Sequence, residues 1–176
     1  VYSRTAFAIL SANARFEDAV AALAYANRHR GQVTAKAFRQ YAMTPAKAAW
    51  VNALPVGPAI LDKVTRQVGE TYHDQRLRLW DTVYGLGLCK ASFLTALLDP
   101  LNADVACIDT HMQQMYLGNT SFVALGLARY LAVESKVRRV AEHHHVSTFI
   151  AQWLLWDHKR GSITSHAIFP GSHREG

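Results

Sequence analysis

The feature that most constrains the fold of this chain is a tight glycine break between two helical segments. Residues 77–83 place apolar side chains at helical spacing, and Gly85 and Gly87 then interrupt the pattern with one residue between them. The segment that follows, residues 88–98, is apolar almost all round, which indicates a buried helix. Its single charged side chain is Lys90. The stretch therefore predicts a helix, a tight turn and a second helix that carries one basic group.

A third helix is expected shortly after this pair. A second apolar run, residues 105–108, ends at Asp109, and Thr110 could help to cap the helix that follows. Glycine in a turn between helices lets backbone N–H groups point outward and lets an anion such as phosphate approach closely. This part of the chain thus combines a turn suited to anions with an acid at the start of a helix.

The remaining sequence has helical patterns, and none of it alternates as a strand would. We expect helical segments at residues 1–10, 15–30, 34–43, 45–54, 60–68, 70–84, 111–117 and 147–159, with an apolar stretch at 122–133 and a basic one at 135–145. From Gly161 the chain is rich in Gly, Ser and His and is expected to be irregular. The sequence shows no repeat and no linker, so we predict an all-α fold.

Length and charge narrow the class of protein. The chain has 176 residues, half of them hydrophobic, which suits one domain or two small helical lobes that share a cleft. The net charge of +6 favours a polyanionic partner. Cys89 and Cys107 are the only cysteines, so we expect no disulfide framework. No apolar run approaches the roughly 20 residues of a membrane span, and no signal peptide is apparent, so no membrane partner is expected.

Three short motifs lie at a spacing that occurs in a known family. They are Val83-Tyr84-Gly85-Leu86-Gly87, Lys90-Ala91 and Ile108-Asp109-Thr110-His111. Together they resemble the helix-hairpin-helix DNA glycosylase superfamily. In that family the hairpin binds the DNA backbone and the later acid is catalytic. The combination is more specific than a lone pair of glycines.

The resemblance implies one helical glycosylase-like unit over residues 1–176. The helix-hairpin-helix would occupy about residues 71–98, and the N-terminal helix and about residues 110–160 would form the second lobe, with a cleft between the lobes. The implied partner is double-stranded DNA, and the protein would bind it as a monomer. It would do so in a DNA-containing compartment such as the cytoplasm or nucleoid. The only cofactor implied is a possible monovalent cation at the hairpin. Some members hold an iron–sulfur cluster on four C-terminal cysteines, and none follows Cys107, so that cluster is excluded.

Asp109 and Lys90 are the candidate catalytic residues. Breaking a nucleoside C1′–N bond requires stabilisation of an oxocarbenium-like sugar and activation of a nucleophile, and one carboxylate can serve both needs. Asp109 suits this role, with a simple helix cap as the alternative. In the family's register the Schiff-base lysine falls on Cys89, and Lys90 lies one residue later, about 100° around the helix. Lys90 is therefore either an amine nucleophile or a lysine whose stem covers apolar surface, and Cys89 is expected to be a small buried side chain.

The residues expected to contact DNA lie at two turns. Backbone N–H groups of Gly85, Leu86 and Gly87 would bind phosphate at the hairpin. Asn13 stands where some family members place a glutamine that fills the gap left by an extruded base, and its amide offers both a donor and an acceptor. The alternative is that Asn13 simply ends a helix. Arg15 would extend the basic surface, so DNA affinity is expected to fall with salt.

An extruded base also needs a pocket. Gln152 could bind a base edge, and Trp153 and Trp156 could stack on it, with His111 in support. The alternative for these side chains is ordinary core packing. No metal site is expected at residues 143–145, three consecutive histidines, because neighbouring side chains on a helix point in different directions.

The sequence therefore predicts an enzyme of base excision repair: a DNA glycosylase that flips a damaged or modified base and hydrolyses its N-glycosidic bond. AP-lyase activity would be added if Lys90 attacks the sugar. Two alternatives are a DNA base-modifying transferase on the same scaffold and a non-catalytic helix-hairpin-helix module that only binds DNA.

Overall fold

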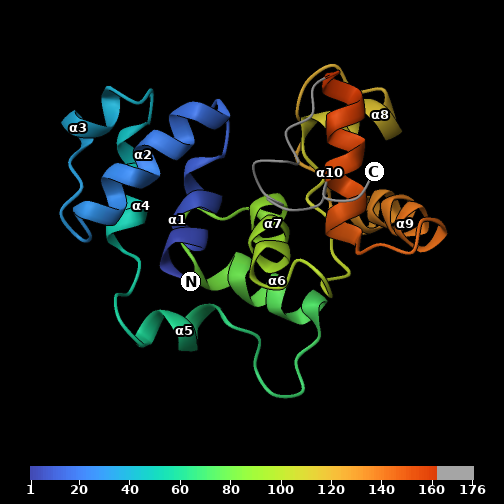
Figure 1. The fold of residues 1–176 in the computed structure, drawn as a ribbon, viewed down its shortest axis with the longest axis horizontal. Helices are drawn as coiled ribbons and strands as arrows, with labels where there is room; N and C mark the ends of the chain where they lie inside the picture. Colours follow the sequence, from blue (N-terminus) through green and yellow to red (C-terminus); the bar gives the residue numbers. More distant parts are fainter. Residues whose placement is uncertain (162–176) are drawn as a thin grey trace, which may run out of the picture. The chain divides into compact units, whose positions relative to one another are not determined.

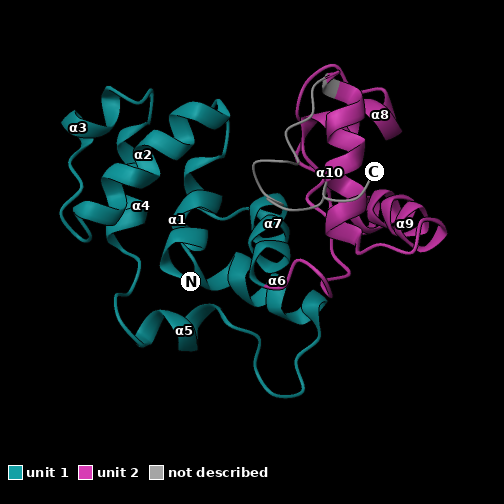
Figure 2. Cartoon of the chain, viewed as in Figure 1, with its two compact units in different colours: residues 1–98 teal, residues 99–176 magenta. Residues whose placement is uncertain are grey.

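A computed structural model describes residues 1–161, which form an all-α fold (Figure 1). Ten helices and no strand occur in this range, so the predicted fold class is confirmed. The chain divides into two compact units, unit 1 comprising residues 1–98 and unit 2 beginning at Asp99 (Figure 2). Apart from Gly161 itself, the segment predicted to be irregular lies outside the described residues. Every helix among residues 1–161 is too short or too polar to cross a lipid bilayer.

Unit 1 contains seven helices, and the first of them lies at its centre. They are α1 (Tyr2–Leu10), α2 (Phe16–Arg28), α3 (Ala35–Arg39), α4 (Pro45–Asn52), α5 (Ala59–Val64), α6 (Tyr72–Thr82) and α7 (Leu88–Leu98). Helix α1 packs on α2, α4 and α7, and its Ala6, Ile9 and Leu10 side chains are fully buried. It thus contributes to the core of unit 1, and its expected grouping with residues 110–160 stays a prediction.

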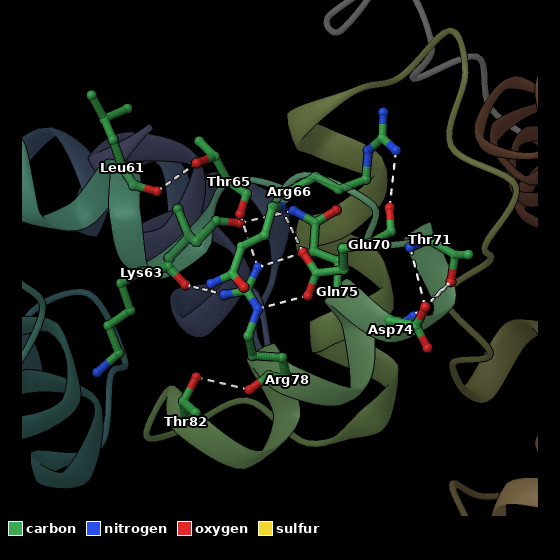
Figure 3. Close-up of polar contacts among 12 residues, drawn as sticks. Leu61, Lys63, Thr65, Arg66, Glu70, Thr71, Asp74, Gln75, Arg78 and Thr82 are labelled. Carbon is green, nitrogen blue, oxygen red and sulfur yellow. Dashed lines mark hydrogen bonds and ion pairs between the residues drawn. The ribbon is translucent and has the colours of Figure 1, made fainter.

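Helix α6, which leads into the hairpin, is fixed at its start by a capping box and along its length by Arg78. Thr71 Oγ1 accepts from the N–H of Asp74 at 3.1 Å, and the Asp74 carboxylate accepts from the N–H of Thr71. Arg78 makes a two-pronged ion pair with Glu70, at 2.7 and 2.8 Å (Figure 3). The same guanidinium donates to the carbonyls of Lys63 and Thr65. One side chain therefore ties the loop between α5 and α6 to α6.

Unit 2 contains α8 (Thr110–Leu117), α9 (Leu127–His143) and α10 (Thr148–Arg160), with α10 packed on both others. The sequence suggested separate segments at 122–133 and 135–145, whereas the structure has one helix that starts at Leu127. It continues without a break because its buried positions recur at helical spacing: Tyr130, Val133, Glu134, Val137 and Ala141. The polar Glu134 lies within this face, which is why the pattern looked interrupted.

Candidate functional site

The candidate residues fall into two groups, one in each unit. Asn13, Arg15, Lys90 and the hairpin glycines belong to unit 1. Asp109, His111 and the α10 residues belong to unit 2. Each group is described separately below, and the cleft expected to join them stays a prediction.

The hairpin between α6 and α7 is a turn whose shape requires glycine at residue 85. Gly85 has a φ of +85°, a conformation that side chains disfavour. A Cβ atom at this position would lie 2.6 Å from Cε3 of Trp50, so the indole ring excludes any side chain. At Gly87 an added Cβ would meet nothing within 4 Å. The residue that sequence reasoning missed here is Trp50, because no local pattern links it to the turn.

Backbone N–H groups at this turn differ in their availability. The N–H of Leu86 donates to Val83 O at 3.2 Å, and the Leu86 side chain is buried, so Leu86 anchors the turn. The N–H groups of Gly85 and Gly87 have no hydrogen-bond partner within residues 1–161. Of the three residues expected to bind phosphate, the two glycines therefore retain unused donors.

Lys90 is half-buried in the first turn of α7, and its ammonium group contacts unit 1 itself. Its Nζ donates to Ser11 Oγ at 3.2 Å and lies 5.0 Å from the centroid of the Phe93 ring. A second lysine, Lys47, is buried nearby and donates to the carbonyls of Leu10 and Ala12, at 2.8 and 2.5 Å. Burial, and then the charge of Lys90, lower the pKa of Lys47. Two cations thus hold the turn that follows α1.

Asn13 lies on that turn, exposed and in a left-handed conformation with φ +48°. Arg15 is exposed too, but its guanidinium makes a two-pronged bond to Asp18, at 2.8 and 3.1 Å. This bond lowers the pKa of the Asp18 carboxyl. The positive charge that the sequence suggested for DNA contact is therefore shared with an acid.

In unit 2, Asp109 occupies the N-cap position of α8, as expected for an acid at a helix start. Its Oδ1 atom accepts from the backbone N–H of Met112 at 3.0 Å and from the indole N–H of Trp156 at 3.1 Å. The Oδ2 atom has no hydrogen-bond partner among residues 1–161, and the residue is half-buried. Two hydrogen bonds therefore fix Oδ1 of the carboxylate, and Oδ2 accepts none from the described residues.

The extended segment that leads to Asp109 is held by buried polar side chains from α9 and α10. Three consecutive backbone N–H groups have side-chain acceptors: Ala106 to Glu134 Oε1 (2.8 Å), Cys107 to Gln152 Oε1 (2.6 Å) and Ile108 to Tyr130 Oη (3.0 Å). The Tyr130 hydroxyl also donates to Ala106 O at 2.7 Å. Because these acceptors replace a neighbouring strand, the segment is ordered without a sheet. Tyr130 and Glu134 were missed in the sequence, where they resemble ordinary residues of an amphipathic helix.

The four residues expected to line a base pocket all belong to unit 2, and three of them, Gln152, Trp153 and Trp156, are buried. Gln152 is fully buried with its Oε1 bound to the backbone, and its Nε2, which has no partner within the described chain, is buried as well. Trp156 donates to Asp109 and packs edge-on against Trp153, with ring centroids 4.8 Å apart. His111 is half-buried in the first turn of α8.

The three histidines at residues 143–145 lie exposed at the end of α9. Within residues 1–161 no group of three or more His, Cys, Asp or Glu side chains is close enough to hold a metal ion.

Comparison of the chain with protein-family models, with curated proteins and with solved structures found no match.

Proposed function

We propose that the chain is a DNA glycosylase that extrudes a damaged or modified base and hydrolyses its bond to the sugar. The observation that supports this most is the state of Asp109: a half-buried carboxylate whose Oδ1 is held by two N–H donors and whose Oδ2 has no partner in the described chain. A residue that served only as a helix cap would need the first of these donors and not the second. The resemblance of the surrounding motif to the glycosylase superfamily supplies the reaction.

In the proposed reaction the carboxylate acts on the sugar and on water. As the C1′–N bond breaks, the departing base takes the bonding electrons and the sugar gains positive charge, which the negative carboxylate stabilises. Water then attacks C1′ and gives a proton to the carboxylate, which acts as general base. The carboxylic acid then gives this proton up to solvent and the departed base takes one from solvent, so the products are an abasic site, the neutral base and the original carboxylate.

Unit 1 would bind the DNA backbone. The free N–H groups of Gly85 and Gly87 suit a phosphate oxygen, and the net charge of +6 favours a polyanion. A monovalent cation between hairpin and phosphate, a monomeric state and a DNA-containing compartment form part of the same proposal. Asn13, exposed on a turn fixed by two lysines, would fill the space of the extruded base.

Asp109→Asn tests the central claim because the amide keeps the shape and the Oδ1 acceptor but loses the charge. Duplexes that each carry one of a panel of lesions are incubated with either protein and then treated with alkali to cut abasic sites. We expect single-turnover excision to fall about 100- to 10,000-fold, the usual contribution of a general base. Equal yields of abasic sites from both proteins would remove Asp109 from the reaction.

Lyase activity through Lys90 needs a separate test. Its neutral amine would attack C1′ and displace the base, and opening of the sugar ring at the C1′–O bond would give a Schiff base, which borohydride reduces to a stable covalent complex. We expect Lys90→Ala to lose this trapped complex, with Lys47→Met as the control because Lys47 is buried with its ammonium bonded to two carbonyls. Undiminished trapping by Lys90→Ala would exclude the role and leave Lys90 as a support for the turn at Ser11.

A second candidate, a DNA-binding module without catalysis, is favoured by one observation. The hairpin and the Trp50 ring that shapes it both belong to unit 1, so this structure is complete without Asp109. The Asp109→Asn experiment separates the two candidates. A pure binding module would release no base, and its affinity for duplex DNA would not change in the variant.

A further inference from the structure

We infer that Trp156 is a positioning residue, which holds the Asp109 carboxylate so that Oδ2 is the oxygen that acts on the sugar and the water. This inference rests on the proposed function. It assigns to Trp156 a role different from stacking on a base, the role that the sequence suggested. It also assigns different tasks to the two oxygens of one carboxylate.

Both hydrogen-bond donors reach the same oxygen of the Asp109 carboxylate. The N–H of Met112 and the indole N–H of Trp156 lie 3.0 and 3.1 Å from Oδ1. A carboxylate turns readily about its last torsion, because that bond has broad energy wells. A single donor leaves this rotation largely open, whereas two donors from different directions hold Oδ1 in place. The position of Oδ2 is then fixed as well.

Helix α10 holds the chain before α8 at two points. Gln152 and Trp156 are four residues apart on one face of α10, and they bind the backbone of Cys107 and the side chain of Asp109. Between these two points the N–H of Asp109 donates to Cys107 O at 3.0 Å and closes a tight turn. One helix therefore holds both ends of this turn, and the contact from Trp156 is part of that arrangement.

The indole ring of Trp156 is itself held in place by its surroundings. Trp156 is only 4% exposed, and its ring packs edge-on against Trp153. A buried donor in a low-dielectric setting makes a stronger bond to a charged acceptor than an exposed one does. The bond is consequently able to hold the carboxylate while charge develops on the sugar.

Phe149 provides a control on the same helix. It is only 1% exposed and packs edge-on against Trp153, as Trp156 does, with ring centroids 6.1 Å apart. Trp156→Phe and Phe149→Leu therefore both replace a buried ring in the core of unit 2 by a smaller side chain, but only the first removes a hydrogen bond to Asp109. The difference between the two variants isolates the hydrogen bond from the loss of packing.

The experiment measures two quantities for the wild type and both variants: the single-turnover excision rate at saturating protein and the Kd for duplex DNA. We expect Trp156→Phe to lower the rate about 10- to 100-fold, the effect of one hydrogen bond to a charged group, with a Kd within twofold of wild type. Phe149→Leu should change neither quantity more than about threefold. A rate loss shared equally by both variants would overturn the inference.

A second variant covers the case in which Trp156→Phe does not fold. Benzothienylalanine at residue 156 keeps the ring shape and replaces the N–H by sulfur, so it removes the donor with almost no change in packing. The same rate loss is expected, and an unchanged rate would overturn the inference. Absence of excision by the wild type on every lesion would overturn the proposed function and this inference together, whereas excision that neither change at residue 156 affects would overturn the inference alone.

Discussion

The hairpin of unit 1 and the segment before Asp109 in unit 2 are both short irregular stretches that lead into a helix, yet they are held in different ways. At the hairpin the backbone conformation of Gly85 and the ring of Trp50 leave room for one shape only. Before Asp109, three consecutive N–H groups are bound by side chains of α9 and α10. Steric exclusion shapes the first stretch, and hydrogen bonding shapes the second.

This difference determines how each stretch should respond to mutation. Added volume should damage the hairpin, because the space above Gly85 is already filled by the indole ring. The Asp109 segment should instead be sensitive to the loss of a polar atom, because three of its buried backbone N–H groups are bound by side-chain oxygens. The predictions below test this contrast.

The largest effect is expected for Tyr130→Phe, which removes one oxygen that serves two backbone groups. Its hydroxyl accepts from the N–H of Ile108 and donates to Ala106 O. Each buried group left without a partner costs about 1–3 kcal/mol, so the free energy of unfolding should fall by about 2–6 kcal/mol. Urea denaturation followed by circular dichroism measures the change.

Tyr84→Phe is the matched control for this variant. Tyr84 is 74% exposed on the hairpin, and the same oxygen is removed there into solvent. We expect a change within about 0.5 kcal/mol. If the two variants lose equal stability, hydrogen bonding does not hold the Asp109 segment, and the contrast between the two regions is wrong.

The hairpin should respond to a single added methyl group. Gly85→Ala places a Cβ 2.6 Å from the Trp50 ring and forces alanine to a φ near +85°. The left-handed conformation costs about 1–2 kcal/mol and the overpacking about 1–3 kcal/mol, so a total near 3 kcal/mol is expected. Urea denaturation again gives the value.

Gly87→Ala tests whether the cost depends on the position. The added Cβ at this neighbouring glycine meets nothing within 4 Å, so stability should stay within about 1 kcal/mol of wild type. Gly85→Ala should cost less stability when it is made in a Trp50→Ala background than in the wild type, because the obstructing ring is gone. An equal cost in both backgrounds would mean that backbone strain alone explains the requirement for glycine.

The contrast also explains what the sequence could predict. Glycine and apolar spacing are local signals, so the all-α fold and the tight turn at residues 85–87 followed from them. A helix start near Asp109 was expected too, but with Thr110 as a possible cap, whereas Asp109 itself is the N-cap. The helix at residues 88–98 was predicted with its observed bounds, because its apolar run ends sharply on both sides. These features depend on neighbours within a few residues.

The contacts that position Asp109 had no such signal. The side chains that bind the segment before it lie 22 to 45 residues further along the chain, on helices with ordinary amphipathic patterns. Gln152 was expected to bind a base edge, whereas its amide oxygen accepts from the backbone N–H of Cys107. The type of a polar residue can indicate that it forms a hydrogen bond, but only the fold shows which group is its partner.

The smallest effect is expected at Glu70. Its ion pair with Arg78 holds the start of α6, the helix that leads into the hairpin. Glu70→Gln weakens both bonds to Arg78, and loss of one hydrogen bond to a charged group should cost about 1.5 kcal/mol at pH 7. Glu142→Gln, an exposed glutamate on α9, is the control and should change stability by less than about 0.5 kcal/mol. Urea midpoints of the three proteins give both values.

The pH dependence of the same variant shows whether charge is the cause. The bonds from Arg78, and then the backbone N–H of Gln67, lower the pKa of Glu70 from its ordinary value of 4.5. The folded chain therefore binds fewer protons at this site than the unfolded chain, and the contribution of Glu70 is complete above pH 4.5 and declines as the pH falls through the lowered value. The stability difference between wild type and Glu70→Gln should accordingly shrink in acid. A difference that is constant from pH 7 to pH 3 would show that shape rather than charge holds α6, as it holds the turn at Gly85, and would extend steric control to the whole hairpin region.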